Sequence, residues 1–318
     1  MFPLRKGPSG PKASGSGAAI APFSFEKFVD PATLIPLADQ DGSVSAPYST
    51  MQGAIDDNLG VPITLALVGT LYPEDVVVPV GTPVFINSNF SVVQSLTLDA
   101  GAVCFLTAGI LQIGVLTLGV GANFISVGSV VVLGATTIGA GASFQSFVVA
   151  SLNGPAVMGT ASQIISLGGF TFGSISDAPG ASGSALVLAG PSSAESGIAV
   201  NSNTVGTITM SMAQIKIVGA EVTGPIVDTG GKIAFEEVRV SGDVTCDELY
   251  LRDTSVLSGD YTTTGRVQVL SSNTAAANWN NALAFPLELD AFSNYWIKIN
   301  GTVLTNPGAK VITSDVVP

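Results

Sequence analysis

The side chains best suited to acid–base chemistry in this chain occur as neighbouring pairs of carboxylates. The pairs are Asp56/Asp57, Glu74/Asp75, Glu236/Glu237 and Asp247/Glu248. A glycosidase needs two carboxyl groups roughly 5–9.5 Å apart across a cleft. Adjacent residues of a strand point to opposite faces, so neighbours of this kind do not form such a pair. We therefore predict that none of these residues is catalytic.

The other residue types that carry chemistry are scarce. The chain has no His, which excludes Ser-His-Asp and Cys-His sites and any His-ligated zinc. Its two cysteines, Cys104 and Cys246, are too few for a disulfide framework. Residues 39–42 match only a fragment of a calcium-binding loop. We predict a protein that is not an enzyme and that holds neither a metal nor a cofactor.

Charge is sparse and unevenly distributed along the chain. Its 318 residues include 11 Lys and Arg against 23 Asp and Glu, which gives a net charge of −12. Four of the cations lie before residue 28, and the next one is Lys216. An acidic chain without a basic face is unsuited to phosphate backbones, so nucleic acid is excluded as a partner.

The segment from Ala100 to Ser176 contains no charged residue at all. Part of it, residues 101–134, is apolar enough to resemble a membrane span. Several glycines, Gln112 and Asn123 interrupt that part, and no cations flank it to set a membrane topology. We therefore predict no contact with a membrane.

The uncharged segment carries a repeat of twenty residues. Glycines recur at this spacing without slippage: Gly81, Gly101, Gly121 and Gly141. Short β-rich runs separated by Gly at such a period are typical of a solenoid, whose coils hydrogen-bond to the coils above and below. Glycine is expected where each coil turns with a positive φ. We predict an all-β fold, a parallel β-helix with about 20 residues per coil.

Two ranks of apolar side chains are expected to stack inside the coils. The first rank contains Val84, Cys104, Phe124 and Phe144, and the second contains Val93, Ile113 and Leu133. Inward side chains of a solenoid meet their equivalents one coil away, at a distance of about 4.8 Å. Cys104 is accordingly expected to be a buried core thiol rather than a reactive one.

Composition divides the chain into three parts. We predict an extended anchoring arm at residues 1–45, the β-helix with a short capping helix at 46–272, and a small β cap at 273–318. After about residue 150 the period blurs, and we interpret the later β-rich runs as coils with irregular loops. The last part has a hairpin signal at Asn300-Gly301. The alternative for its aromatic residues is a sugar-binding tip made by Trp279, Tyr295 and Trp296.

The beginning of the repeat region resembles a known family. Met51, Gln52, Ala54 and Ile55 match the capping helix of right-handed parallel β-helix proteins of the pectin-lyase-like kind, and either Ser49 or Thr50 supplies an N-cap. Gly69, Tyr72 and Glu74 loosely match the corner that follows in that family. The resemblance implies the fold. Enzymes of the family use clustered Asp, Arg or Gln on one face of the helix, and no such cluster maps onto this chain.

A second resemblance lies in the architecture. A small-residue arm, a β-helix and a compact C-terminal β piece are similar to the virion proteins of tailed bacterial viruses. Because Pro and Gly disfavour a core within the arm, its apolar and basic residues suit a partner's groove. The predicted anchoring residues are Phe2, Leu4, Arg5, Lys6, Lys12, Phe23 and Phe25. The resemblance implies attachment to the major capsid protein or another virion protein, on the external surface of the particle.

The uncharged coils favour association of the chain with itself. A lone β-helix normally shows charged side chains to water, so a long segment without charge indicates that symmetry mates cover its outer surface. We therefore expect a homotrimer that decorates or cements a capsid, as a head-fibre or cement protein without enzymatic activity. Two alternatives stay open. One is a receptor-binding tail fibre or tailspike that recognises host surface glycans, and the other is a polysaccharide depolymerase.

Overall fold

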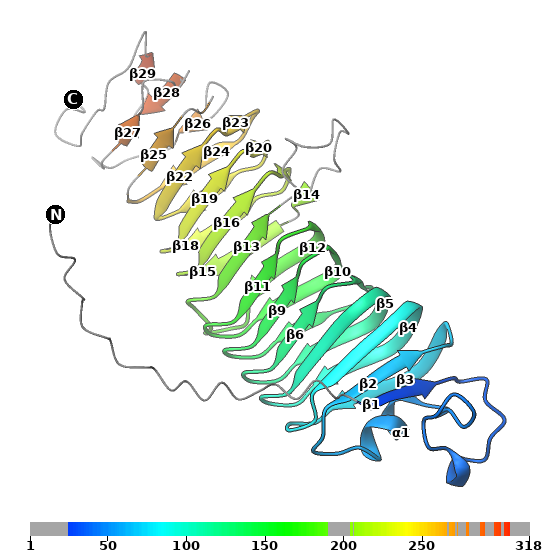
Figure 1. The fold of residues 1–318 in the computed structure, drawn as a ribbon. Coiled ribbons are helices and arrows are strands. Elements are labelled where there is room, and N and C mark those ends of the chain that lie inside the picture. Colours follow the sequence, from blue (N-terminus) through cyan, green and yellow to red (C-terminus); the bar gives the residue numbers. More distant parts are fainter. Residues whose placement is uncertain are drawn as a thin grey trace, which may run out of the picture.

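The computed structural model is an all-β parallel β-solenoid with roughly 20 residues per coil (Figure 1). It describes residues 25–189, 204–205, 207–265, 267–270 and 272, and short strands at 278–279, 287–289, 296–299 and 302–305. Strands of successive coils pair in parallel along the stack. The predicted fold class and coil length are therefore confirmed.

Each coil has three sides, which we call A, B and C in the order in which the chain visits them. Side A is formed by β1 (Phe25–Val29), β2 (Ile63–Leu67), the starts of β4 (Val84–Leu98) and β5 (Val103–Leu118), β6 (Asn123–Ser126), β9 (Ser143–Ser146), β11 (Gln163–Ser166), β13 (Ala185–Ala189), β16 (Gln214–Val218), β19 (Lys232–Glu236), β22 (Glu248–Arg252), β25 (Val267–Leu270) and β27 (Leu287–Leu289). Side B is formed by the start of β3 (Leu71–Val78), the middles of β4 and β5, β7 (Ser129–Val132), and the starts of β10 (Val149–Met158) and β12 (Gly169–Asp177). A separate four-stranded sheet contains β14 (Thr204–Val205), β17 (Glu221–Val222), β20 (Arg239–Val240) and β23 (Ser255–Val256). Side C is formed by the ends of β3, β4, β5, β10 and β12 together with β8 (Thr136–Ile138), β15 (Thr207–Ser211), β18 (Ile226–Thr229), β21 (Val244–Cys246), β24 (Asp260–Thr263) and β26 (Asn278–Trp279).

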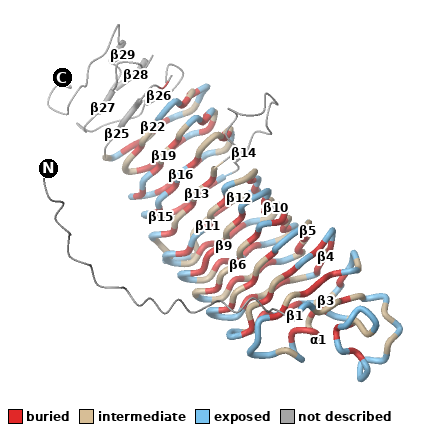
Figure 2. Tube along the Cα trace, in the orientation of Figure 1, coloured by how far each residue is buried: buried red, intermediate tan, exposed pale blue. Residues whose placement is uncertain are grey.

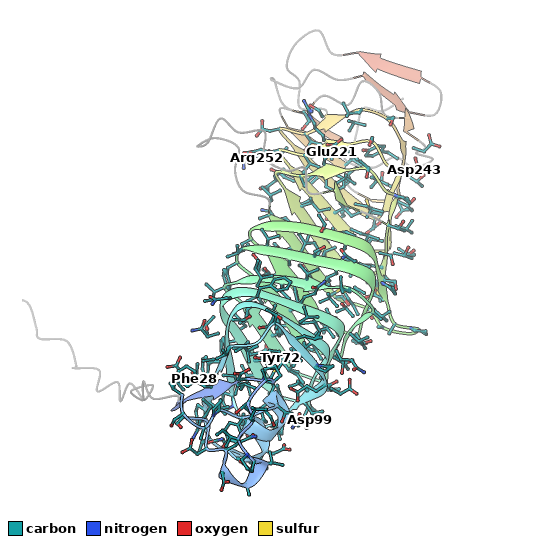
Figure 3. All side chains as sticks on the ribbon, turned by 90° about the vertical axis from the view of Figure 1, so that its right-hand side faces the viewer. Phe28, Tyr72, Asp99, Glu221, Asp243 and Arg252 are labelled. Carbon is teal, nitrogen blue, oxygen red and sulfur yellow. The ribbon has the colours of Figure 1, made fainter. Side chains whose placement is uncertain are left out.

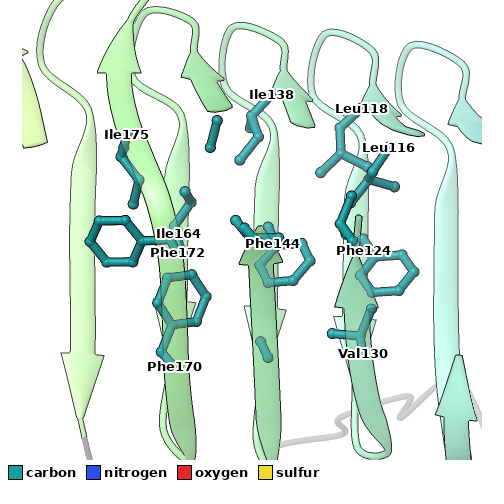
Figure 4. Packing of buried hydrophobic residues seen from close by; sticks show 14 of the residues in the cluster. Leu116, Leu118, Phe124, Val130, Ile138, Phe144, Ile164, Phe170, Phe172 and Ile175 are labelled. Atoms are coloured by element: carbon teal, nitrogen blue, oxygen red, sulfur yellow. The ribbon is translucent and has the colours of Figure 1, made fainter. Parts of the chain in front are cut away.

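The first predicted rank of core side chains lies on side A. Val84 pairs in register with Cys104, Cys104 with Phe124, and Phe124 with Phe144. All four are fully buried, and the rings of Phe124 and Phe144 stack with their centroids 5.5 Å apart (Figure 4). The rank continues through Ile164, Leu186, Ile215, Ile233, Leu249 and Val267. Each such side chain removed from water stabilises the fold by about 1.5–3 kcal/mol. Buried and exposed positions alternate along the strands around this core (Figure 2).

The second predicted rank is wrong at one position. Val93 pairs with Ile113 as expected, but Ile113 pairs with Val132 rather than with Leu133. Val132 is fully buried, whereas Leu133 is 47 % exposed. The corner before Val132 is one residue shorter than the equivalent corner of the preceding coil, and the next corner is one residue longer. The whole coil still has twenty residues, so the twenty-residue repeat in the sequence does not reveal the shift of register on side B.

The four repeated glycines turn the chain from side C to side A. Gly81, Gly101, Gly121 and Gly141 have φ values of 82°, 75°, 66° and 66°. A side chain at three of them would meet no atom within 4 Å, and at Gly101 the nearest atom would be 3.7 Å away. Glycine is therefore required at these turns by the left-handed backbone and not by lack of space.

The blurred repeat after residue 150 has a simple cause, which is a change of coil length. In the core rank, Ile215 pairs with Ile233, 18 residues on, and Ile233 pairs with Leu249, 16 residues on. A longer connection separates Leu186 from Ile215. The coils continue with the same inward alternation, but no single period describes them.

The N-terminal end of the stack is held by the residues of the pectin-lyase-like resemblance. Helix α1 (Met51–Asp56) begins at Thr50, whose hydroxyl accepts a hydrogen bond from the backbone N–H of Gly53 at 3.0 Å. The Glu74 carboxylate accepts the backbone N–H groups of Met51 and Gln52 at 2.7 and 3.1 Å. The short 3-10 helix η1 (Leu37–Asp39) precedes α1. Glu74 therefore fixes α1 to the coil that follows it.

Tyr72, the other matched corner residue, anchors the first strand. Its ring is buried, its hydroxyl donates to the carbonyl of Val29 at 2.8 Å, and the backbone N–H of Gly69 donates to it at 2.9 Å. Burial raises the pKa of Tyr72 to about 12, so the phenol stays protonated and keeps both hydrogen bonds. The two bonds tie β1 to the corner of the second coil.

The structure describes only parts of the predicted N-terminal arm and of the predicted C-terminal cap. Residues 25–29, predicted as part of the arm, form β1 and pair in parallel with β2, so this portion belongs to the solenoid. At the other end, β28 (Trp296–Ile299) and β29 (Thr302–Thr305) pair in antiparallel fashion, as the Asn300-Gly301 signal predicts. The rest of the arm and most of the predicted C-terminal cap lie outside the described residues.

Candidate functional site

Several of the paired carboxylates make structural contacts. In each pair for which the structure records a bond, the acid has a local structural partner. Asp75 accepts a hydrogen bond from the Ser95 hydroxyl at 2.7 Å, and Asp247 accepts one from the Thr264 hydroxyl at 2.7 Å. Glu74 binds the start of α1 as described above, and Glu236 and Glu248 each pair with a lysine. Asp75, Glu236, Asp247 and Glu248 therefore fasten neighbouring coils to one another, whereas Glu74 holds α1.

A ridge of exposed apolar side chains follows the corner between sides A and B. Val127, Phe147 and Leu167 are the first residues after β6, β9 and β11, and they are 55 %, 48 % and 47 % exposed. Their backbone N–H groups bond to the coil before in the same way, to the carbonyls of residues 106, 126 and 146. Exposed apolar residues next to this corner are Phe90, Ile110, Val148 and Val149. We call these seven residues the apolar ridge.

Six of the seven residues of the apolar ridge, all except Phe90, lie in the uncharged segment from Ala100 to Ser176. Figure 3 shows the labelled charged residues towards the two ends of the stack, with Asp99 in the early coils and Glu221, Asp243 and Arg252 in the late ones. Large contiguous apolar patches on a protein surface mark interaction sites. The ridge is therefore the first candidate for a functional surface.

A groove on side A is the second candidate. It has a volume of about 480 Å³ and lies over β13, β16, β19 and β22. The outward row Val187, Lys216, Ala234 and Tyr250 runs across these strands in register. The methyl group of Ala234 is far smaller than its neighbours Lys216 and Tyr250, so it leaves a notch between them.

Two ion pairs border this groove. The Lys216 ammonium lies 3.1 Å from the Glu236 carboxylate, and the Lys232 ammonium lies 2.9 Å from that of Glu248. The pairs join β16 to β19 and β19 to β22, and their side chains are partly exposed. They place both donors and acceptors at the rim without net charge.

This groove was not predicted from the sequence. A signal was present, because Lys216 and Lys232 are the first cations after residue 27 and both occupy outward positions of β-rich runs. Without the register, nothing indicated that Ala234 lies between Lys216 and Tyr250.

The buried nucleophilic and titratable groups lie inside the solenoid. Cys104 and Cys246 are free and buried, and burial raises the pKa of the Cys104 thiol to about 12, as expected for a core thiol. Asp228 is fully buried on side C. Its Oδ1 accepts the backbone N–H of Ala213 at 3.0 Å, and its Oδ2 has no hydrogen-bond partner. Burial, opposed by that hydrogen bond and assisted by Asp177, raises the pKa of Asp228 to about 6.

The predicted functional residues fall in three groups. The core residues Cys104, Phe124 and Phe144 and the four repeated glycines lie where the repeat places them. Phe25 lies in β1, Trp279 in β26 and Trp296 in β28. The other predicted contacts lie outside the described residues: Phe2, Leu4, Arg5, Lys6, Lys12, Phe23 and Tyr295.

No family model, curated protein or solved structure matches this chain. The candidate site is therefore described by its geometry alone. Within the described part of the chain, no helix is both long and apolar enough to cross a membrane. The same residues contain no group of three or more Cys, Asp or Glu side chains placed to hold a metal ion.

Proposed function

We propose that the chain is a structural, non-catalytic β-solenoid that forms a homotrimer through its apolar ridge. The observation that carries the proposal is the exposure of large apolar side chains on successive coils of the segment without charge. Val127, Phe147 and Leu167 recur at the same corner of three successive coils, whereas single exposed apolar residues elsewhere need no explanation.

A second copy of the chain suits this ridge better than an unrelated partner. Val127, Phe147 and Leu167 recur once per coil, so two ridges lying side by side have the same spacing of about 4.8 Å and can interdigitate along their length. Neither copy brings a charge that would have to be buried unpaired. Closed rotational symmetry then lets three copies cover one another's ridges.

The first test introduces a charge into the ridge. Phe147→Glu is expected to convert the trimer into monomers, because three carboxylates would be brought together in an apolar contact. Light scattering on purified protein gives the mass of the assembly, and circular dichroism checks that the sheet is kept.

The matched control for this test is Val120→Glu, at an exposed apolar position of the same uncharged segment on the corner between sides C and A. The control is expected to remain trimeric. A wild-type protein that is monomeric at micromolar concentration contradicts the self-association itself.

The proposed trimer decorates or cements a virus capsid. What supports this placement is the architectural resemblance to virion proteins, together with the composition of the N-terminal arm. Arg5, Lys6 and Lys12 are basic, whereas no cation follows between residues 28 and 215. Basic residues guide such a segment to an acidic surface, and its Phe and Leu side chains then hold it there.

The second test removes the arm up to the first described strand. A chain that lacks residues 1–24 keeps β1 and is expected to fold and trimerise, but to lose binding to particles that lack the protein. Co-sedimentation with such particles measures the binding. If the shortened chain co-sediments as well as the full chain, the arm is not the anchor.

A further inference from the structure

We infer that the groove on side A binds a neutral, hydroxyl-rich ring, namely a pyranose unit of an uncharged glycan. This site is distinct from the apolar ridge, because the ridge follows β6, β9 and β11, whereas the groove spans the later strands β13, β16, β19 and β22. It would add a recognition function to the proposed structural one.

The shape of the groove follows from one small residue. Lys216 and Tyr250 lie two strand spacings apart in the same outward row, which is about 10 Å. Ala234 lies between them in register with both. The space above its methyl group is therefore one strand wide and open to water, and the floor of a parallel sheet keeps it rigid.

The walls of the groove combine an aromatic ring, an aliphatic floor and charged groups at the rim. Tyr250 supplies an aromatic ring, while Ala234 and Val187 supply an aliphatic floor. Aromatic faces pack against flat apolar surfaces, and the C–H face of a pyranose ring is such a surface. The rim offers the ammonium and carboxylate groups of Lys232 and Glu248, which can donate to and accept from hydroxyl groups.

Charge balance decides against other ligands. Both lysines of the groove are already paired with a glutamate, so an anion would have to displace a carboxylate and approach a chain of net charge −12. A cation is attracted by that net charge but would have to displace a lysine ammonium from each pair. A wholly apolar ligand would strip water from the ion pairs without replacing it. A neutral polyhydroxylated ligand leaves both pairs intact and hydrogen-bonds to them.

The test uses a defined panel of oligosaccharides with the full-length protein. Neutral hexamers of glucose, galactose, mannose and N-acetylglucosamine are titrated beside hexagalacturonate and inorganic phosphate. Binding is followed by calorimetry and by the ¹³C-methyl resonance of Ala234. We expect at least one neutral hexamer to bind and to shift that resonance, while hexagalacturonate and phosphate do neither.

Variants then connect the binding to the groove. Tyr250→Ala and Ala234→Leu are expected to weaken the affinity at least tenfold, the first by removing the ring and the second by filling the notch. Tyr250→Phe keeps the ring and is expected to stay within threefold. Ala135→Leu makes the same enlargement at an exposed alanine between β7 and β8 and is expected to leave binding unchanged.

Three results would overturn the inference. They are no binding by any neutral hexamer, binding that survives both Tyr250→Ala and Ala234→Leu, and preferential binding of hexagalacturonate or phosphate. None of them bears on the trimer, whose mass is measured separately on the same samples. Failure of the glycan site and failure of the proposed self-association are therefore distinguishable.

Discussion

Replacing Gly168 by alanine is expected to lower the free energy of unfolding by roughly 3 kcal/mol or more. Gly168 follows Leu167 at the corner between sides A and B, and a Cβ atom there would overlap the backbone carbonyl of Val148 one coil earlier. Val148 lies in the bend between β9 and β10, and its backbone carbonyl cannot move aside as the end of a flexible side chain can. The coils on either side must therefore separate, which breaks the hydrogen bond from Leu167 N–H to the Ser146 carbonyl.

The matched control is Gly121→Ala. Its φ of 66° is unfavourable for alanine, but no atom lies within 4 Å of the added Cβ. This substitution is expected to lower the free energy of unfolding by about 1–2 kcal/mol, which is the cost of placing alanine in the left-handed backbone conformation. Urea titration followed by circular dichroism measures both changes, and hydrogen exchange of the β9 and β11 amides locates them. Equal losses for the two variants would show that close approach of the coils is not what selects glycine at position 168.

Replacing Asp228 by asparagine is expected to stabilise the protein at pH 8 by up to about 3 kcal/mol. The pKa of this carboxyl is raised to about 6 in the folded state, from 3.8, mainly by its burial. A raised pKa means that the folded state binds the proton more tightly than the unfolded state does. Each unit of pKa difference corresponds to 1.36 kcal/mol, so about two units give the quoted figure.

The direction of the pH dependence follows from the same difference. Below about pH 4 the carboxyl is protonated in both states, and its contribution to stability is fully present. Between about pH 4 and 6 the wild-type protein loses that stability, because the unfolded state ionises first and the folded state must then bury a charge. Asparagine stays neutral and retains an acceptor for the Ala213 N–H, so its stability is expected to be nearly flat over this window.

Urea titrations at pH 4, 6 and 8 measure the effect. Asp99→Asn makes the same change at an exposed turn and is expected to alter stability by less than about 0.5 kcal/mol. If Asp228→Asn is as unstable at pH 8 as the wild-type protein, the buried carboxylate has a partner or a water that offsets its burial.

The sequence by itself determined the regular part of the solenoid. A turn of fixed conformation recurs every twenty residues at Gly81, Gly101, Gly121 and Gly141. Because the number of residues between these turns is constant, Cys104 stacks between Val84 and Phe124. The N-terminal end was predicted only in part: the helix expected at residues 51–55 is present, whereas residues 25–29, expected in the arm, form β1.

The alternation of buried and exposed residues carried more information than the period. Ile226 points inward, so Asp228, two residues on, must do so as well. The buried carboxylate could therefore have been predicted from its position in the strand. The pairing of Leu133 could not, because one corner loses a residue and the next gains one, and the two changes cancel in the coil length.

Only the tertiary structure decided which ranks are exposed and which outward residues of the late coils lie together. The twenty-residue repeat already places Val127, Phe147 and Leu167 in one rank, and the structure decided that this rank is exposed at the corner after side A. The groove depends on coils of 18 and 16 residues that bring Lys216, Ala234 and Tyr250 into one row. Spacing along the chain does not fix such a row when coil length varies, since the hydrogen-bonded register between neighbouring coils sets it.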